Sequence, residues 1–302
     1  MAHKTMMVFF VFMTALLAGL AVLAQAGQVQ APAKPAVPAP TPMTVEKLAE
    51  NLYWFKGGVM ANAGFYVGDK NVFVIDVKMT PEAAKAMIAA IAQITPKPIG
   101  EIILTHSDAD HVNGLTAFPL GLGITSSDNT RKEMEQAFKD EKMAAYRAYL
   151  PNVTFTGHIE VEGLPAMLYC FGPAHTSGDT VVFFPKAKVA FIGDLAFIGR
   201  DPLIHRQKGG TSFGLAKTLH EILKLDAAVF IAGHNDPLSR ADLEGLVKGI
   251  EEKQAKVKDL IAAGKTLDEI KKAMGVEEQS VGGRRWPSLI EVIYLDITEK
   301  RF

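Results

Sequence analysis

Cysteine is nearly absent from this 302-residue chain, which contains a single one, Cys170. One thiol excludes an internal disulfide and any zinc site built mainly from cysteines. The chain also lacks an excess of charge of either sign, since its formal net charge is −1 at pH 7. A nearly neutral chain offers no electrostatic basis for binding nucleic acid or an anionic membrane surface.

The first 26 residues have the composition of a secretory signal peptide. Met6 to Leu23 is apolar, and Ala24, Gln25 and Ala26 form the small-x-small pattern of a cleavage site. An uncleaved membrane anchor is the alternative, because the apolar run is nearly long enough to span a bilayer. We expect cleavage after Ala26, export to the periplasm or out of the cell, and no stable membrane insertion afterwards.

Residues 27–45 are rich in proline and alanine, which predicts an extended linker. We place the folded domain at 46–302, with a C-terminal helical extension from about 239. Strands are predicted at 52–55, 64–67, 72–75 and 102–104, and again at 166–171, 180–184, 189–192 and 228–231. Helices are predicted after Thr80, over 128–150 and 212–225, and after Ser239 and Thr266. Two β-rich halves that each carry helices predict an α/β fold with two sheets face to face.

Four potential metal ligands lie within six residues, in the segment His106-Ser107-Asp108-Ala109-Asp110-His111. Unpaired charge is costly to bury, and crowded carboxylates repel each other unless a cation lies between them. Asp and His suit Zn²⁺, Fe or Mn²⁺. A polar loop with chance histidines is the alternative. Three further residues at the ends of predicted strands argue against it, namely His175, Asp194 and His234.

The local geometry of this segment follows from the strand before it. In an extended chain alternate side chains point the same way, so we expect His106, Asp108 and Asp110 to share a face. Curvature of the loop would then bring in His111.

The pattern Thr-His-x-x-x-Asp-His-x-x-Gly, then a later His, a Gly-Asp and a Gly-His, resembles the metallo-β-lactamase superfamily over about residues 50–236. The resemblance implies that superfamily's four-layer αββα sandwich and a binuclear metal site. It implies one metal ion at His106, Asp108 and His175, a second at Asp110, His111 and His234, and Asp194 bridging both. The bridging Asp is typical of the hydroxyacylglutathione hydrolase (glyoxalase II)-like branch, whereas the zinc β-lactamases lack it.

Asp108 departs from the family pattern, which usually has His at this position. A carboxylate adds negative charge to the site, so we expect a metal that is a weaker Lewis acid than in a three-His site. We expect two divalent ions, with zinc as the first choice and Fe or Mn as alternatives.

The resemblance implies hydrolysis of a small-molecule substrate, in which a metal-bridging hydroxide attacks the carbonyl of a thioester, lactone or other ester-like bond. Asp110 is expected to act in catalysis as well, by accepting a hydrogen bond from the nucleophile. A zinc β-lactamase that hydrolyses a lactam amide is one alternative, and a non-hydrolytic diiron redox protein is another. The oligomeric state stays open.

Six residues near the expected ligands are candidates for substrate contacts. The loop after Asp194 carries cations that could bind a substrate carboxylate, although a solvated surface loop is equally consistent with its composition. The six candidates are His205, Arg206, Lys208, Asn235, Met60 and Asn62. Asp76, at the end of its predicted strand, is expected to orient a metal ligand.

The signal-peptide hypothesis predicts that the mature protein begins near Gly27 and is exported. N-terminal sequencing of the protein recovered from a secreting host is the measurement. A membrane-bound protein that retains residues 1–26 would contradict cleavage and support the anchor.

Overall fold

The computed structural model describes residues 42–302 except 59, 277–278 and 282–283. The predicted signal peptide and most of the predicted linker lie outside the described residues. In the described part, no helix combines the length and apolar character that a membrane span requires. The first strand, β1, begins at Thr44 and pairs with β2 from Thr44 opposite Lys56. The folded region therefore starts inside the range predicted as linker, because this pairing extends the sheet.

In the described residues, the first sheet has seven strands in the order β1-β2-β3-β4-β5-β6-β7. Strands β1 to β4 are antiparallel neighbours, whereas β4 to β7 run parallel to one another. The bounds are β1 Thr44–Ala49, β2 Leu52–Lys56, β3 Ala63–Val67, β4 Val72–Ile75, β5 Ile99–Ile103, β6 Gly123–Ser127 and β7 Val153–Phe155.

The second sheet has six strands in the described residues, in the order β13-β12-β11-β10-β9-β8. Only its β11 and β12 pair in parallel, and the other neighbours are antiparallel. The bounds are β8 His158–Glu160, β9 Met167–Tyr169, β10 Val181–Phe184, β11 Val189–Gly193, β12 Val229–Ala232 and β13 Leu238–Ser239. A separate hairpin pairs β14, Gln279–Val281, with β15, Arg284–Trp286.

The central strands are apolar on both faces, and the alternation of their side chains divides the core into layers. In β4, Phe73 and Ile75 join the cluster between the sheets, while Val72 and Val74 join the cluster under the first group of helices. In β10, Val182 and Phe184 face the first sheet, and Val181 and Phe183 face the second group of helices.

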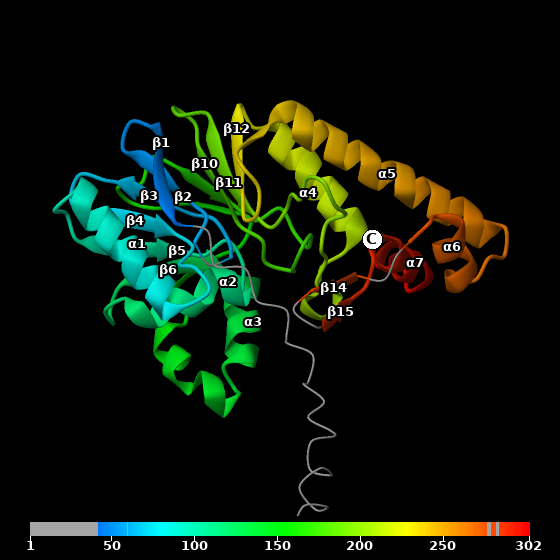
Figure 1. Cartoon of the computed structure of the whole chain (residues 1–302), viewed down its shortest axis with the longest axis horizontal. Helices are drawn as coiled ribbons and strands as arrows, with labels where there is room; N and C mark the ends of the chain where they lie inside the picture. The colour runs from blue at the N-terminus through cyan, green and yellow to red at the C-terminus, as the bar shows by residue number, and fades with distance from the viewer. Residues whose placement is uncertain (1–41, 59, 277–278, 282–283) are drawn as a thin grey trace, which may run out of the picture. The chain divides into compact units, whose positions relative to one another are not determined.

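Helices cover the outer face of each sheet, as Figure 1 shows for α1 to α3 on one side and α4 and α5 on the other. The predicted four-layer αββα sandwich is therefore confirmed. The helices on the first sheet are α1 Pro81–Ile94, α2 Ala109–Val112, η1 Asn113–Ala117, α3 Asp128–Ala137 and η2 Glu141–Tyr149. The others are η3 Arg206–Lys208, α4 Ser212–Lys224, α5 Arg240–Ala262, α6 Leu267–Ala273 and α7 Leu289–Thr298.

The two sheets are in close contact at Gly64 in β3. A Cβ atom added there would lie 2.3 Å from the ring of Phe191 in β11, well inside van der Waals contact. Glycine at this position therefore lets Phe191 fill the space between the sheets.

Helix starts followed the predicted capping signals, but one helix did not run as expected. Thr80, Ser239 and Thr266 cap α1, α5 and α6. The range 128–150 is helical as predicted but divided, because α3 ends at Ala137 and a 3-10 helix, η2, starts at Glu141. Asp140 separates them, since its carboxylate accepts a hydrogen bond from the backbone N–H of Lys142 and so favours a new helix start.

Candidate metal centre

The candidate site lies where two pairs of parallel strands end. Asp76 follows β4 and His106 follows the neighbouring β5 by a few residues, while Asp194 follows β11 and His234 follows the neighbouring β12. Because the carboxyl ends of parallel strands meet at one edge of a sheet, each pair delivers its polar residues to a common place. The packing of the two sheets then brings the two pairs together.

The structure gathers the seven predicted ligands into two groups. In each group, one ligand atom per residue lies within 4.8 Å of the others. The first group is His106, Asp108, His175 and Asp194, and the second is Asp110, His111 and His234. This grouping agrees with the division that the family resemblance implied, and the role of each residue as a ligand stays a prediction.

Asp194 lies between the two groups. One carboxylate oxygen, Oδ1, is 3.2 Å from Nε2 of His111, and the other, Oδ2, is 3.2 Å from Nε2 of His234. Oδ2 is also 4.0 Å from Nε2 of His175 in the first group. A carboxylate in this place can reach cations in both groups, which is the geometry that a bridging ligand needs.

One geometric expectation was wrong. Asp110 does not share a face with His106 and Asp108, because the chain leaves the extended conformation at Asp108 and enters α2 at Ala109. The helical turn directs Asp110 and His111 to the second group, beside His234. The prediction failed because it assumed an extended chain up to Asp110, whereas a helix begins at Ala109.

Asp76 contacts His111 directly and His106 through Thr105, which suits the orienting role predicted for it. Its carboxylate accepts hydrogen bonds from Nδ1 of His111 at 2.7 Å, and from the backbone N–H and the hydroxyl of Thr105 at 2.8 and 2.7 Å. The Thr105 hydroxyl is in turn 3.0 Å from Nδ1 of His106. Nδ1 of His175 has its own acceptor, the carbonyl oxygen of Leu203 at 2.8 Å. With Nδ1 engaged in all three rings, Nε2 is left to face the site.

Buried atoms without partners test whether these residues fit a metal ion. Within the described residues, Nε2 of His106, Nε2 of His111 and Oδ1 of Asp194 are buried and have no hydrogen-bond partner. Leaving buried acceptors unsatisfied costs free energy, and a cation between them removes that cost. Imidazole nitrogens and carboxylate oxygens are the donors that Zn²⁺, Fe and Mn²⁺ accept. The donor set therefore fits divalent metal ions.

The mutual fields of these groups shift their pKa values. Burial alone would lower the pKa of His175, but the hydrogen bond and charge of Asp108 raise it to about 9. Burial likewise opposes a raised pKa in His234, and Asp110 and Asp194 raise it to about 9. Burial would raise the pKa of Asp194, yet His111 and His234 hold it well below its usual range. A bound metal ion must therefore displace protons from the imidazoles.

Gly233 makes the close approach at the end of β12 possible. A Cβ atom at this position would lie 2.0 Å from Oδ1 of Asp194 and 3.0 Å from the His111 ring. Any side chain here would displace the carboxylate from between the two groups.

Two residues predicted to contact substrate bind Asp108, and their contact with substrate stays a prediction. Nζ of Lys208 is 2.6 Å from Oδ1 of Asp108, and Nε2 of His205 is 2.6 Å from its Oδ2. His205 is buried, and its ring also meets the ring of Trp286 edge-on at 4.4 Å. The sequence contained only a weak signal of this arrangement, namely cationic residues in the loop after Asp194.

The other substrate candidates are mostly engaged by protein groups. Arg206 forms ion pairs with Asp296 and Glu299 of the C-terminal part of the chain. The amide of Asn62 donates to the carbonyl oxygens of Ala232 and Asn235 at 2.8 and 2.7 Å.

Asn235 and Met60 differ in how far protein groups engage them. Oδ1 of Asn235 accepts from the backbone N–H of Ile198 at 3.1 Å. Met60 is 54% exposed. Of the six candidates, Met60 is therefore the one whose side chain extends into solvent.

Glu133, on α3, holds the two ligand-bearing loops together and was not predicted. Its Oε2 accepts a hydrogen bond from the hydroxyl of Ser107, next to His106. Its Oε1 accepts from the backbone N–H and hydroxyl of Ser177, beyond His175, at 3.2 and 2.6 Å. A glutamate in a charged, surface-type helix gave no signal of this role.

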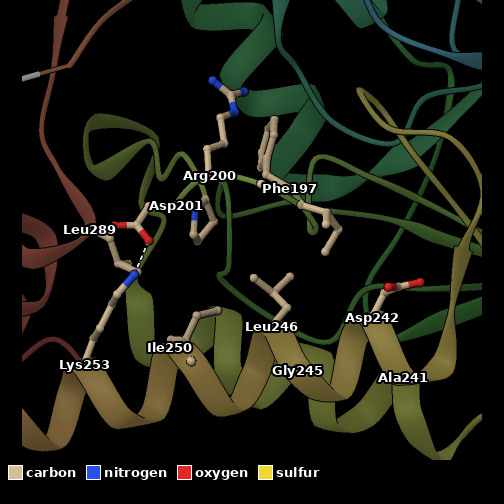
Figure 2. Close-up of a pocket in the computed structure, with 14 residues that line it drawn as sticks. Phe197, Arg200, Asp201, Ala241, Asp242, Gly245, Leu246, Ile250, Lys253 and Leu289 are labelled. Atoms are coloured by element: carbon tan, nitrogen blue, oxygen red, sulfur yellow. Dashed lines mark hydrogen bonds and ion pairs between the residues drawn. The ribbon is translucent and has the colours of Figure 1, made fainter.

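A groove of about 390 Å³ lies between the segment 197–202 and α5. Figure 2 shows Asp201 and Lys253 paired across it, while Phe197 and Arg200 extend together from the segment, away from α5. The ring of Phe197 stacks on His234 with centroids 5.5 Å apart, and the guanidinium of Arg200 lies 4.3 Å from the Phe197 ring centroid. Arg200 is exposed, so this stack places an accessible cation on the ring that packs against His234 of the second group.

Comparison with known proteins identifies the family. The metallo-β-lactamase superfamily model matches residues 57–234, more than half of the chain. The chain belongs to the metallo-β-lactamase superfamily. It is a hydrolase of this superfamily, and both candidate metal groups include residues from the matched region.

The chain is similar in sequence to a β-lactamase and to a subunit of an O-demethylase. The hydrolase is 30% identical over 234 residues to the metallo-β-lactamase type 2 of Elizabethkingia meningoseptica, covering 71% of this chain and 87% of that one. It is 26% identical over 231 residues to the 2,4-dinitroanisole O-demethylase subunit alpha of Nocardioides sp. (strain JS1661), covering 75% and 68%. These relatives are not glyoxalase II proteins, to which the sequence pattern had pointed.

Solved structures share the fold. The DIM-1 metallo-β-lactamase superposes with a TM-score of 0.61 at 17% identity, covering 71% of this chain and 99% of that one. The metallo-β-lactamase of Erythrobacter litoralis gives 0.59 at 19% identity, covering 70% and 96%.

The raised pKa values predict how pH acts on the protein stripped of metal. The pKa values of His175 and His234 rise from 6.5 to about 9 on folding, so their stabilisation is present below pH 6.5. It is lost as pH rises through about 9. We expect the melting temperature of chelator-treated protein to fall between pH 6.5 and 9, and that of zinc-loaded protein to fall less. Thermal unfolding followed by circular dichroism measures both; equal slopes would contradict the charged imidazole–carboxylate pairs.

Proposed function

We propose that this hydrolase cleaves an ester-like carbonyl bond, in a thioester or a lactone. It does so with two divalent metal ions, for which zinc is our first choice. The observation that carries the proposal is the position of Asp194, whose two oxygens face His111 and His234 at 3.2 Å each. A shared carboxylate suits a pair of cations that act on one substrate.

When bound, the metal ions would supply an activated water molecule and polarise the substrate carbonyl. The chain supplies the rest. Asp110, whose Oδ2 lies 3.2 Å from Nε2 of His234, accepts a hydrogen bond from the attacking water and so aligns it. Asp76 and Thr105 hold the histidine rings in fixed orientations during the reaction.

A second candidate is hydrolysis of a lactam amide, as in a zinc β-lactamase. The 30% identity to the Elizabethkingia enzyme favours it. Asp194 and Asp108 favour the ester-like bond instead, because the sequence pattern of zinc β-lactamases lacks the first and usually has His at the second position. A diiron redox protein is the third alternative, and the metal content decides it.

A substrate panel tests the proposal most directly. Protein purified without added metal is first assayed for Zn, Fe and Mn, and is then offered chromogenic thioester, lactone and cephalosporin substrates. We expect zinc, and thioester or lactone turnover that exceeds cephalosporin turnover. Preferential cephalosporin cleavage would establish the lactam alternative, and iron without hydrolysis would establish the redox alternative.

Replacing the shared carboxylate should remove metal and turnover together. Asp194→Ala leaves His111 and His234 without their common partner, so we expect the metal content to fall by about one ion per chain and kcat/KM to drop at least about a hundredfold. Asp226→Ala is the matched control, because Asp226 is an exposed carboxylate that pairs with Lys188 and belongs to neither metal group. If Asp194→Ala kept two tightly bound ions and full turnover, the shared role would be wrong.

Arg200 should recognise an anionic group on the substrate. Its guanidinium rests on Phe197, which stacks on His234, so a carboxylate bound there would lie near the second group. We expect Arg200→Ala to raise KM about tenfold for substrates with a carboxylate and to leave kcat nearly unchanged. Arg200→Lys should retain part of the effect, and a neutral ester analogue should respond to neither variant. An equal loss for neutral and anionic substrates would assign Arg200 to the support of the loop.

A further inference from the structure

Asp108 differs from the family's usual histidine in carrying a negative charge, and protein groups bind both of its oxygens. Oδ1 receives the Lys208 ammonium at 2.6 Å. Oδ2 lies 2.6 Å from Nε2 of His205, and 3.2 Å from Nε2 of His175 in the first metal group. The Lys208 ammonium thus contacts the oxygen on the side away from the first metal group's histidines, which leaves Oδ2 facing them.

Lys208 has its hydrogen bonds filled at this place. Besides Asp108, its Nζ donates to the hydroxyl of Ser107 at 2.8 Å and to the carbonyl oxygen of Ser107 at 3.2 Å. An ammonium has three donors, so the three contacts satisfy it. Its side chain is 25% exposed, and this partial burial strengthens its interaction with the carboxylate.

The backbone around Lys208 is fixed from both sides. The N–H of His205 donates to the carbonyl oxygen of His175 at 2.8 Å, and the N–H of Thr211 donates to that of Ala174 at 3.0 Å. Arg206 is paired with the buried Asp296 of α7. The segment that carries Lys208 is therefore attached both to the His175 loop and to the C-terminal helix.

The charges explain why an ammonium belongs beside Asp108. Two divalent ions carry four positive charges, and Asp110 and Asp194 offset two of them when the remaining ligands are neutral histidines. A third carboxylate at position 108 leaves a single positive charge. The ammonium of Lys208 raises the net charge back to +2, which is the net charge of a centre with the family's usual histidine at position 108.

We propose that Lys208 is a charge-compensating residue for Asp108, so that the Asp108–Lys208 pair replaces the single histidine of the family pattern without changing the net charge of the metal centre. This inference rests on the metal-dependent hydrolase proposed above, because it requires a cation beside Asp108. It also changes the expectation from the sequence, in which Asp108 alone weakened the metal as a Lewis acid.

Zinc affinity in a double-mutant cycle tests the pair, with Zn²⁺ alone as the probe and a chelator as competitor. Lys208→Met removes a positive charge next to the cation and should tighten Zn²⁺ binding about tenfold. Lys208→Arg should retain the wild-type affinity. Asp108→His alone leaves the ammonium uncompensated and should weaken binding, and Asp108→His combined with Lys208→Met should recover it. Lys56→Met is the control, because Lys56 pairs with Asp236, two residues after His234.

The outcomes separate the possibilities. Weaker Zn²⁺ binding in Lys208→Met would overturn the inference, since a mere clamp loses affinity when it is removed. A double variant that binds no better than Asp108→His would overturn it as well. A wild-type protein that binds Zn²⁺ and hydrolyses esters, with no coupling between positions 108 and 208, would refute the inference and leave the proposed function standing. A wild-type protein that binds no divalent metal would refute both.

Discussion

The metal centre depends on the hydrogen bonds that the buried carboxylate of Asp76 accepts. It receives three hydrogen bonds from the neighbouring strand end, two from Thr105 and one from His111. These bonds attach the end of β4 to the loop after β5, and they fix which nitrogen of His111 faces the centre. Through the Thr105 hydroxyl the same carboxylate also orients His106. The hydrogen bonds around this buried acceptor leave the histidines little freedom to rotate.

The sequence predicted those parts of the centre that are local. His106, Asp194 and His234 each follow an apolar strand, so their common location follows from strand ends, and the αββα layers follow from two β-rich halves with helices. What the sequence could not show is which distant groups meet. Lys208 lies one hundred residues from Asp108, and no periodic pattern connects them. Glu133 could not be distinguished from an ordinary surface glutamate, and the turn of α2 that redirects Asp110 spans four residues, too short for a periodic signal.

The C-terminal extension reaches the centre although it lies beyond the region that defines the family. The superfamily match ends at residue 234. Trp286 then packs against His205, and Asp296 holds Arg206 and also accepts from the backbone N–H and hydroxyl of Ser212. Both contacts support the segment that carries Lys208. The extension therefore shapes the surroundings of Asp108 from outside, and a change in α7 can alter the centre without touching any predicted ligand.

The placement of the centre across the two sheets has a consequence for how the chain matures. His106 and His111 belong to the half that a ribosome makes first, and His234 is made about 120 residues later, so neither half alone holds a complete set of donors. The centre is complete only after the second sheet has docked on the first, where Gly64 leaves room for the ring of Phe191. Metal binding at the two groups would then report that docking, because a nascent or half-folded chain has no assembled set of donors in which to trap a wrong ion.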